Sequence, residues 1–346
     1  MKAMILPGVR PLAEGNPPLI LSEMPMPVPK PGELLIQVGA CGVCHTELDE
    51  IEGRTPPSRL PMVLGHQVAG RVVGQLPASG KPAPGFQPGD RVGVGWIHSS
   101  CGQCEFCRQG RENLCPEFAA TGRDAPGGYA EYMTVPAGYA YPVPEEFSDA
   151  EAAPLLCAGG VGYRSLALTG LQDGQNLGFT GFGASGHLVL KLVQGLYPHV
   201  KTYVFTRSQE QRQFALDLGA TWAGALEDEA PVKLQAVIDT TPVWKPIVTA
   251  LANLDKGGRL VINAIRKENH DRECLLSLDY GQHLWEEKEI KSVANVTRED
   301  VTAFLQAAAR FHIKPEIQTY RLEEANQALF DLKAGKIRGA KVIVMR

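Results

Sequence analysis

The chain lacks a long uninterrupted apolar segment and has no excess of basic charge. Its 346 residues carry a formal net charge of -4, and residues 1–21 are interrupted by Pro7, Arg10 and Pro11. A secretory signal needs an unbroken apolar stretch, a membrane-spanning helix needs about 20 apolar residues, and a nucleic-acid surface needs clustered Lys and Arg. We therefore expect a cytoplasmic protein that binds neither membranes nor nucleic acid.

The length and composition predict two globular domains. A single hydrophobic core usually stops growing at roughly 250–300 residues, and this chain is longer. With 44% hydrophobic and 21% charged residues, and no tract of one residue type, the whole chain has the composition of folded protein. Without a secretory signal the eight cysteines belong to a reducing compartment, which favours metal ligands over disulfides.

Half of the cysteines stand in one short run, at Cys101, Cys104, Cys107 and Cys115. This spacing is typical of a tetrahedral zinc site made of four thiolates. Because four thiolates fill every coordination position, no water can be activated there. The run therefore predicts a structural zinc site rather than a catalytic one.

Three further residues of zinc-ligand type, Cys44, His66 and Cys157, are scattered along the chain. Three protein ligands would leave one coordination position open for water or substrate, as in catalytic zinc sites. Cys41 lies three residues before Cys44, and we interpret it as a small packed residue. Cys274 has no partner pattern, and its role stays open.

The pattern of expected secondary structure changes near residue 171. From residue 32 to about 154, short β-rich runs such as 34–38 and 68–73 alternate with Pro and Gly turns. Beyond 171, apolar strand-like runs alternate with helical ones such as 209–218, which predicts a parallel sheet covered by helices. The expected strands are 176–180, 201–205, 236–240, 259–263 and 289–293. The last thirty residues return to the first pattern, so we expect the C-terminus to fold back onto the N-terminal domain.

A glycine-rich loop follows the first strand of this second region, with Gly181, Gly183 and Gly186 in the pattern G-x-G-x-x-G. The motif alone is weak, but here it lies between an expected strand and an expected helix. Glycines allow a tight turn and close backbone approach, and the helix N-terminus offers free amides to a pyrophosphate. The loop therefore predicts a dinucleotide site.

The end of the second strand indicates which dinucleotide binds. NAD-preferring sites usually place Asp or Glu there, about 20 residues after the loop, to bind the ribose hydroxyls. This chain has Thr206 and Arg207 followed by Ser208. Because an Arg and two hydroxyls can bind a phosphate and no carboxylate repels it, we predict that NADP(H) is preferred over NAD(H).

Together these motifs resemble the zinc-dependent alcohol dehydrogenases of the medium-chain dehydrogenase/reductase superfamily, over essentially the whole chain. The matching runs are residues 41–47, 65–67, 127–132 and 154–159. The resemblance implies an α/β fold with a doubly wound parallel Rossmann domain and a β-rich, GroES-like catalytic domain that holds both zinc sites. It places the catalytic domain at residues 1–155 and 298–346 and the Rossmann domain at residues 156–297.

The resemblance also implies roles for single residues. Thr46 is the first proton-relay group, and Asp49 stands where the family often has the next relay histidine. Glu47 replaces the usual Asp that orients the zinc-binding His. His45 and Arg338 match basic groups near the cofactor pyrophosphate. Trp96 matches a bulky wall of the substrate pocket, which would favour primary alcohols and unhindered aldehydes.

The sequence therefore predicts an alcohol dehydrogenase or aldehyde reductase with two zinc ions per chain, which transfers a hydride between NADP(H) and a primary alcohol or aldehyde. By family resemblance we expect a homo-oligomer, either a dimer or a tetramer. One alternative is an NAD-dependent polyol or secondary-alcohol dehydrogenase. The other, from a different class, is a catalytically silent protein that binds zinc and nucleotide. The physiological substrate and the preferred reaction direction stay open.

Overall fold

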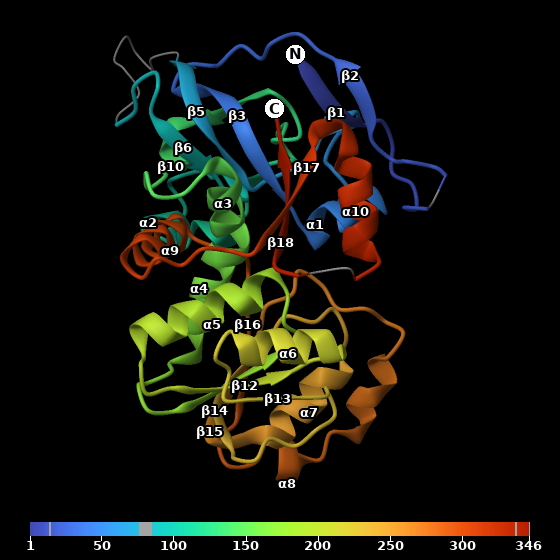
Figure 1. The fold of residues 1–346 in the computed structure, drawn as a ribbon, viewed down its shortest axis with the longest axis vertical. Coiled ribbons are helices and arrows are strands. Elements are labelled where there is room, and N and C mark those ends of the chain that lie inside the picture. Colours follow the sequence, from blue (N-terminus) through green and yellow to red (C-terminus); the bar gives the residue numbers. More distant parts are fainter. Residues whose placement is uncertain (14, 76–84, 336–337, 346) are drawn as a thin grey trace. The chain divides into compact units, whose positions relative to one another are not determined.

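The chain forms two compact units in a computed structural model, which describes residues 1–13, 15–75, 85–335 and 338–345 (Figure 1). The first unit comprises Met1–Cys157, Val296–Ala309 and Lys314–Arg346. The second comprises Ala158–Asn295 and Arg310–Ile313. None of the described helices combines the length and the apolar composition that crossing a bilayer requires.

The first unit is built on a seven-stranded sheet of order β10-β6-β5-β3-β18-β17, with β9 paired to β3. Its strands are β3 (Glu33–Val43), β5 (Val68–Gln75), β6 (Arg91–Val94), β9 (Tyr132–Pro136), β10 (Ala140–Pro142), β17 (Ile317–Arg321) and β18 (Ala340–Val344). Burial alternates along the first part of β3, as expected of a strand with one face on a core. Because β18 pairs antiparallel with β3, the predicted return of the C-terminus to the N-terminal domain is confirmed.

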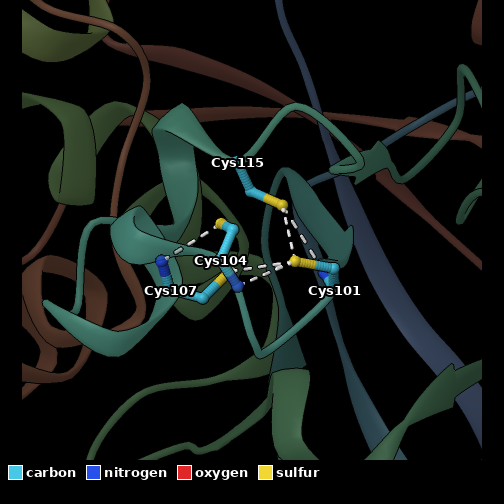
Figure 2. Close-up of side chains that lie close together, drawn as sticks. All are labelled: Cys101, Cys104, Cys107 and Cys115. Carbon is cyan, nitrogen blue, oxygen red and sulfur yellow. Dashed lines mark hydrogen bonds between the residues drawn. The ribbon is translucent and has the colours of Figure 1, made fainter.

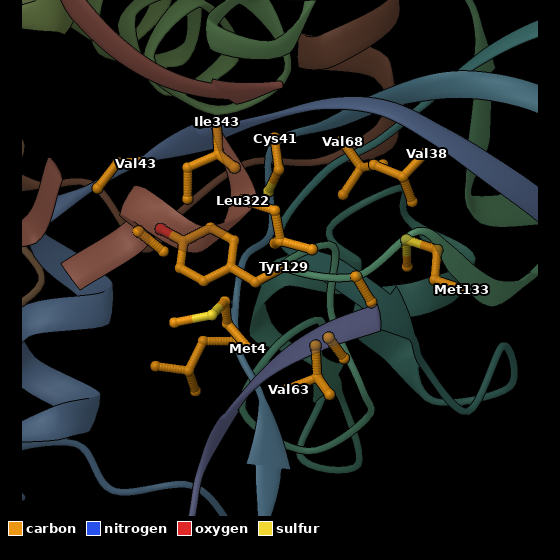
Figure 3. Close-up of a cluster of buried hydrophobic side chains, with 14 of the residues drawn as sticks. Met4, Val38, Cys41, Val43, Val63, Val68, Tyr129, Met133, Leu322 and Ile343 are labelled. Carbon is orange, nitrogen blue, oxygen red and sulfur yellow. The ribbon is translucent and has the colours of Figure 1, made fainter. Parts of the chain in front are cut away.

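Smaller elements complete the first unit. Its other strands are β1 (Lys2–Leu6), β2 (Ile20–Glu23), β4 (Met62–Val63), β7 (Ile97–Ser99) and β8 (Ala119–Ala120). Its helices are α1 (His45–Ile51), α2 (Glu105–Arg108), α3 (Asp149–Pro154), α9 (Arg298–Arg310) and α10 (Ala325–Lys333). Figure 3 shows the core, where Tyr129 lies among side chains from both ends of the chain, including Met4 and Ile343.

The second unit contains a parallel six-stranded sheet of order β13-β12-β11-β14-β15-β16. The strands are β11 (Asn176–Thr180), β12 (Lys201–Phe205), β13 (Trp222–Gly224), β14 (Leu234–Asp239), β15 (Leu254–Ile262) and β16 (Glu289–Ser292). The helices are α4 (Gly160–Thr169), α5 (Ala184–Leu196), α6 (Gln209–Asp217), α7 (Lys245–Asn253) and α8 (Tyr280–His283). The strand order reverses beside β11, which is the doubly wound dinucleotide-binding topology. The predicted fold class is confirmed.

The predicted strands of this sheet agree with the structure to within one residue at every bound except the starts of two strands. The strand expected at 236–240 begins earlier, at Leu234, and the one expected at 259–263 begins at Leu254. A register shift between Leu234 and Ala236 separates the first pair, Leu234 with Leu254, from the rest of the β14–β15 ladder. Gly257 and Gly258 lie in this stretch of β15, and glycine is a poor signal for a strand, so the sequence pattern missed its start.

One irregular helix carries the third residue of the scattered zinc-ligand set. Helix α3 begins at a capping box between Ser148 and Glu151 and contains Pro154. A π-helical turn, Leu155–Gly159, follows directly and holds Cys157. Single π turns inside helices are frequent at functional sites, because the extra residue redirects a side chain.

Candidate metal centres and nucleotide loop

Cys44, His66 and Cys157 converge in the first unit. Cys44 follows the end of β3 and caps α1, His66 lies in the loop before β5, and Cys157 lies in the π-helical turn. Their ligand atoms all lie within 4.8 Å of one another, and His66 Nε2 is 3.2 Å from Cys157 Sγ. Around a tetrahedral zinc these atoms would lie about 3.5–3.8 Å apart. The donor set fits zinc with one coordination position left over.

The two thiols of this set perturb each other. Contact with Cys157 lowers the pKa of Cys44 well below its usual value, and the same contact raises the pKa of Cys157 well above it. A bound zinc ion would deprotonate coordinating thiols outright. The pair is arranged to release protons when metal binds.

Glu47 connects two of these candidate ligands. The carboxylate is fully buried; its Oε2 accepts the Cys44 backbone N–H at 2.7 Å, and its Oε1 lies 2.6 Å from His66 Nδ1. Burial lowers the pKa of His66, but the charges of Glu47 and Cys44 outweigh burial and raise it. Since Nδ1 faces Glu47, Nε2 is directed to the sulfurs. This is the carboxylate–histidine–metal arrangement of zinc enzymes.

Two predicted residues border the set. The Thr46 hydroxyl lies 3.6 Å from Cys44 Sγ. The indole of buried Trp96 meets the His66 ring edge to face, at 4.9 Å between centroids and 84° between planes. Thr46, expected as the relay group, and Trp96, expected as the pocket wall, thus each contact one of the candidate ligands.

Asp49 has a partner that the sequence did not reveal. Arg54 Nε donates a hydrogen bond to Asp49 Oδ1 at 2.5 Å, and its guanidinium also pairs with Glu52. The Asp49 side chain is therefore held in an ion pair at the C-terminal end of α1. The position predicted for the second relay group is thus occupied by a carboxylate that already has a charged partner.

The four cysteines of the run form a second compact set (Figure 2). Cys101 Sγ lies 3.5 Å from Cys115 Sγ and 3.9 Å from Cys107 Sγ, close to the roughly 3.8 Å between thiolates of a tetrahedral zinc. Backbone N–H groups, of Gln103 first and then of Cys104, lower the pKa of Cys101 to about 7. The set fits a zinc ion with no open position.

Cys41 and Cys274 lie outside both sets. Neither cysteine belongs to a group of metal-ligand residues in the part of the chain that the structure describes. Cys41 is fully buried in the core of the first unit, and an added Cβ at Gly65 would lie 2.8 Å from its sulfur. This tight packing agrees with the interpretation of Cys41 as a packed residue.

Two charged groups near the three-ligand set, Glu50 and Arg123, were missed from the sequence. The Glu50 carboxyl is 0% exposed, and neither of its oxygens has a hydrogen-bond partner among the described residues. Burial, and then Glu47, raise its pKa well above the ordinary value. Arg123 stacks over Trp96 at 5.6 Å. The helical spacing of Glu50, one turn after Thr46 and Glu47, was the available signal.

The glycine loop of the second unit joins β11 to α5. Gly181 adopts φ +81°, a left-handed conformation that favours glycine. A Cβ added at Gly183 would meet nothing within 4 Å, whereas one at Gly186 would lie 3.2 Å from the Phe182 ring. Gly181 thus allows the backbone conformation of the turn, Gly183 faces open space and Gly186 allows close packing. This arrangement fits the binding of a dinucleotide pyrophosphate.

The end of β12 carries the residues that we expect to bind the ribose phosphate. Arg207 is exposed, while Thr206 is buried and its hydroxyl donates to Gln211 Oε1. Arg212, which the sequence reading did not include, donates to the backbone carbonyls of Thr206 and Arg207 at 2.9 and 3.1 Å. Two guanidinium groups therefore lie at this strand end. His45 and Arg338, the other predicted cofactor contacts, are both exposed residues of the first unit.

Comparisons with known proteins agree with these features. The model of the alcohol dehydrogenase GroES-like domain matches residues 30–145. The chain is 46% identical to a probable alcohol dehydrogenase, AdhA, of Mycobacterium tuberculosis, over 92% of this chain and 91% of the relative. It is 33% identical to an alcohol dehydrogenase of Geobacillus stearothermophilus, over 95% and 96% of the two chains. A cinnamyl alcohol dehydrogenase structure from Sorghum bicolor superposes with TM-score 0.85 at 27% identity, over 99% of this chain and 97% of that one.

Proposed function

This chain belongs to the zinc-dependent alcohol dehydrogenases of the medium-chain dehydrogenase/reductase superfamily, and from that premise we propose that it interconverts primary alcohols and aldehydes with NADP(H). The observation that supports this best is the convergence of Cys44, His66 and Cys157 beside the Thr46 hydroxyl. Three ligands would leave a position for the substrate oxygen, and the Thr46 hydroxyl lies 3.6 Å from one of these ligands.

The reaction requires a Lewis acid and a hydride carrier, which zinc and the nicotinamide supply when bound. The chain supplies the rest. Cys44, His66 and Cys157 would hold the metal, and Glu47 orients two of them. Thr46 Oγ1 would accept the proton of the alcohol and pass it on to solvent. Asp49 is already paired with Arg54, so we propose that the proton passes from Thr46 directly to water rather than through Asp49.

The preference for primary alcohols is attributed to Trp96. Its indole is fixed between the His66 ring and the Arg123 guanidinium. A rigid indole beside the metal ligands would exclude the second substituent of a secondary alcohol. Replacing Trp96 by Ala should therefore increase activity on secondary alcohols relative to primary ones.

The preference for NADP(H) is attributed to the end of β12. Arg207 and Arg212 can pair with a 2′-phosphate, and position 206 holds a threonine where NAD sites usually have a carboxylate. Because the Thr206 hydroxyl already donates to Gln211, the two arginines carry this proposal more than the threonine does.

The test is an assay of aldehyde reduction with NADPH and NADH in parallel, using zinc-loaded protein and short and aromatic aldehydes. We expect faster oxidation of NADPH. Faster oxidation of NADH would keep the enzyme class and reject the cofactor assignment. Activity on sorbitol-like or threonine-like substrates with NAD would instead support the polyol alternative. No turnover in either direction, with zinc and cofactor bound, would support the silent alternative.

A homo-oligomer is the second part of this proposal. Strand β16 is an edge strand of the six-stranded sheet with all its residues exposed. Its Ile290 is a large exposed apolar side chain, and Leu276 and Trp285 of the same unit are exposed as well. The backbone groups of an edge strand can pair with a second copy, and Ile290 would be covered in such a pair. Light scattering should show an oligomer, and Ile290→Lys should shift it towards the monomer.

A further inference from the structure

A buried ion pair lies at the carboxyl end of the parallel sheet in the second unit. Asp239, the last residue of β14, is 0% exposed, and its partner Lys267 follows β15. Lys267 Nζ donates to Asp239 Oδ2 at 2.5 Å, and the Lys267 side chain is only 7% exposed. Charged side chains are seldom buried unless they are paired, so this position needs an explanation.

The ammonium group of Lys267 holds two chain segments together. Besides Asp239 it donates to the carbonyl oxygens of Thr241 at 2.8 Å and Val243 at 3.0 Å. An ammonium has three donors, and all three are used here. Lys267 therefore fixes the segment after β14 and has no proton left for a ligand.

Asp239 extends this connection to the glycine loop. Its Oδ1 accepts the hydroxyl protons of Thr180 at 2.5 Å and of Thr241 at 2.8 Å. Thr180 ends β11 and immediately precedes Gly181. One carboxylate thus joins the strand that leads into the glycine loop, its own strand and the segment that follows β15.

The glycine turn itself rests on the segment that this pair holds. A Cβ added at Gly181 would lie 2.7 Å from Thr240 Oγ1 and 3.1 Å from Thr241 Cγ2, so the turn packs directly against both threonines. The Thr240 N–H and hydroxyl both donate to the Thr180 carbonyl oxygen, at 2.9 and 3.1 Å. A shift of residues 240–241 would therefore displace the start of the loop.

We propose that Lys267 is a positioning residue for the dinucleotide: with Asp239 it fixes residues 240–243, on which the pyrophosphate-binding turn at Gly181 is seated. This inference rests on the proposed function, because it assumes that the loop binds NADP(H). A buried ion pair adds little net stability compared with an apolar pair of similar size, so stability alone is a weak reason for it. Its distinctive effect is the geometry that it imposes on the loop.

The test is the dissociation constant of the binary NADPH complex, measured by nicotinamide fluorescence with zinc-loaded protein. Lys267→Met should raise it about tenfold, with a smaller change in kcat and unchanged zinc content. Thr180→Val keeps the ion pair but removes its bond to the strand before the loop, and should weaken binding in the same direction by a smaller factor. Lys256→Met, which removes an exposed lysine of the same unit, is the matched control and should bind as wild type.

The outcomes separate the two proposals. If Lys267→Met and Thr180→Val both bind NADPH as tightly as wild type, the positioning role is wrong while the proposed function stands. If Lys267→Met does not fold, Thr180→Val decides the matter alone. If the wild-type protein binds neither NADPH nor NADH, the proposed function fails, and this inference fails with it.

Discussion

The two sets of candidate metal ligands in the first unit are built in different ways. Cys101 and Cys115, the outer members of the four-cysteine set, are only 14 residues apart in sequence. In the three-ligand set, His66 and Cys157 alone are 91 residues apart. The first set comes from one loop, and the second from the end of a strand, a loop and a π-helical turn.

The surroundings of the two sets differ as well. The sulfurs of Cys101, Cys104 and Cys115 accept backbone N–H groups from their own loop, and these bonds lower the pKa of Cys101 to about 7. The three-ligand set is supported by residues from other segments. Glu47 contacts His66, and Trp96 packs against the His66 ring. A closed local set suits a structural role, whereas an open set made by tertiary folding suits chemistry, because its spare position can be shaped by many elements.

The largest expected difference is in turnover. Cys44→Ser should lower kcat by at least about a thousandfold, because the open site would lose a thiolate that holds its zinc. Metal analysis should show loss of one of the two expected zinc ions. Cys41→Ala is the control, since Cys41 is buried nearby without belonging to a ligand set, and it should keep both ions. Wild-type turnover in Cys44→Ser would show that the three-ligand set is not the catalytic site.

The next effect concerns stability. Cys104→Ser should lose the other zinc ion and lower the melting temperature by about 5–10 °C, because a structural metal contributes binding free energy to the folded state. At low temperature the remaining folded protein should still turn over. Cys274→Ser, outside both sets, should melt like wild type. If Cys104→Ser abolished turnover without affecting melting, the closed set would not be structural.

An acid titration of stability can compare the two metal sets only when the contribution of the second unit is known. Part of that contribution comes from His187. Burial lowers the pKa of His187 from 6.5 to about 4. The unfolded chain binds a proton at His187 below pH 6.5 and the folded chain only near pH 4. Stability should therefore fall as the pH drops through this window, by about 3 kcal/mol for this group. His187→Gln should remove that part of the pH dependence in denaturant unfolding, and an unchanged pH profile would contradict the assignment.

The smallest effect tests how each set is supported. Glu47→Gln should weaken zinc binding at the three-ligand set by about tenfold in a chelator competition, because the amide no longer supplies a charge to His66 and Cys44. The four-cysteine set should be unaffected. Glu105→Gln, an exposed carboxylate in the first turn of α2 between Cys104 and Cys107, should change neither affinity. If Glu47→Gln weakened zinc binding equally at both sets, the two sets would be coupled.

The glycine loop shows how far sequence reasoning reached. The pattern from Gly181 to Gly186 between β11 and α5 was predictable, because its function depends on a continuous stretch of backbone. The hydrogen bonds of Thr206 with Gln211 and of Arg212 with the strand end were not, because they depend on how α6 begins. The packing of the loop against Thr240 and Thr241 depends on the neighbouring strand, and no sequence pattern indicates it.

The sequence by itself determined the parts of this protein whose geometry is local: the four-cysteine run, the glycine loop, the order of strands and helices, and the family. Only the tertiary structure decided that Glu47 contacts His66, that Trp96 lies against the same ring and that Lys267 pairs with Asp239. It also decided that Glu50 is buried with no hydrogen-bond partner among the described residues. The physical reason is that spacing along the chain fixes distances only over a few residues. Contacts between distant residues depend on strand register and side-chain packing, which many weak interactions set together.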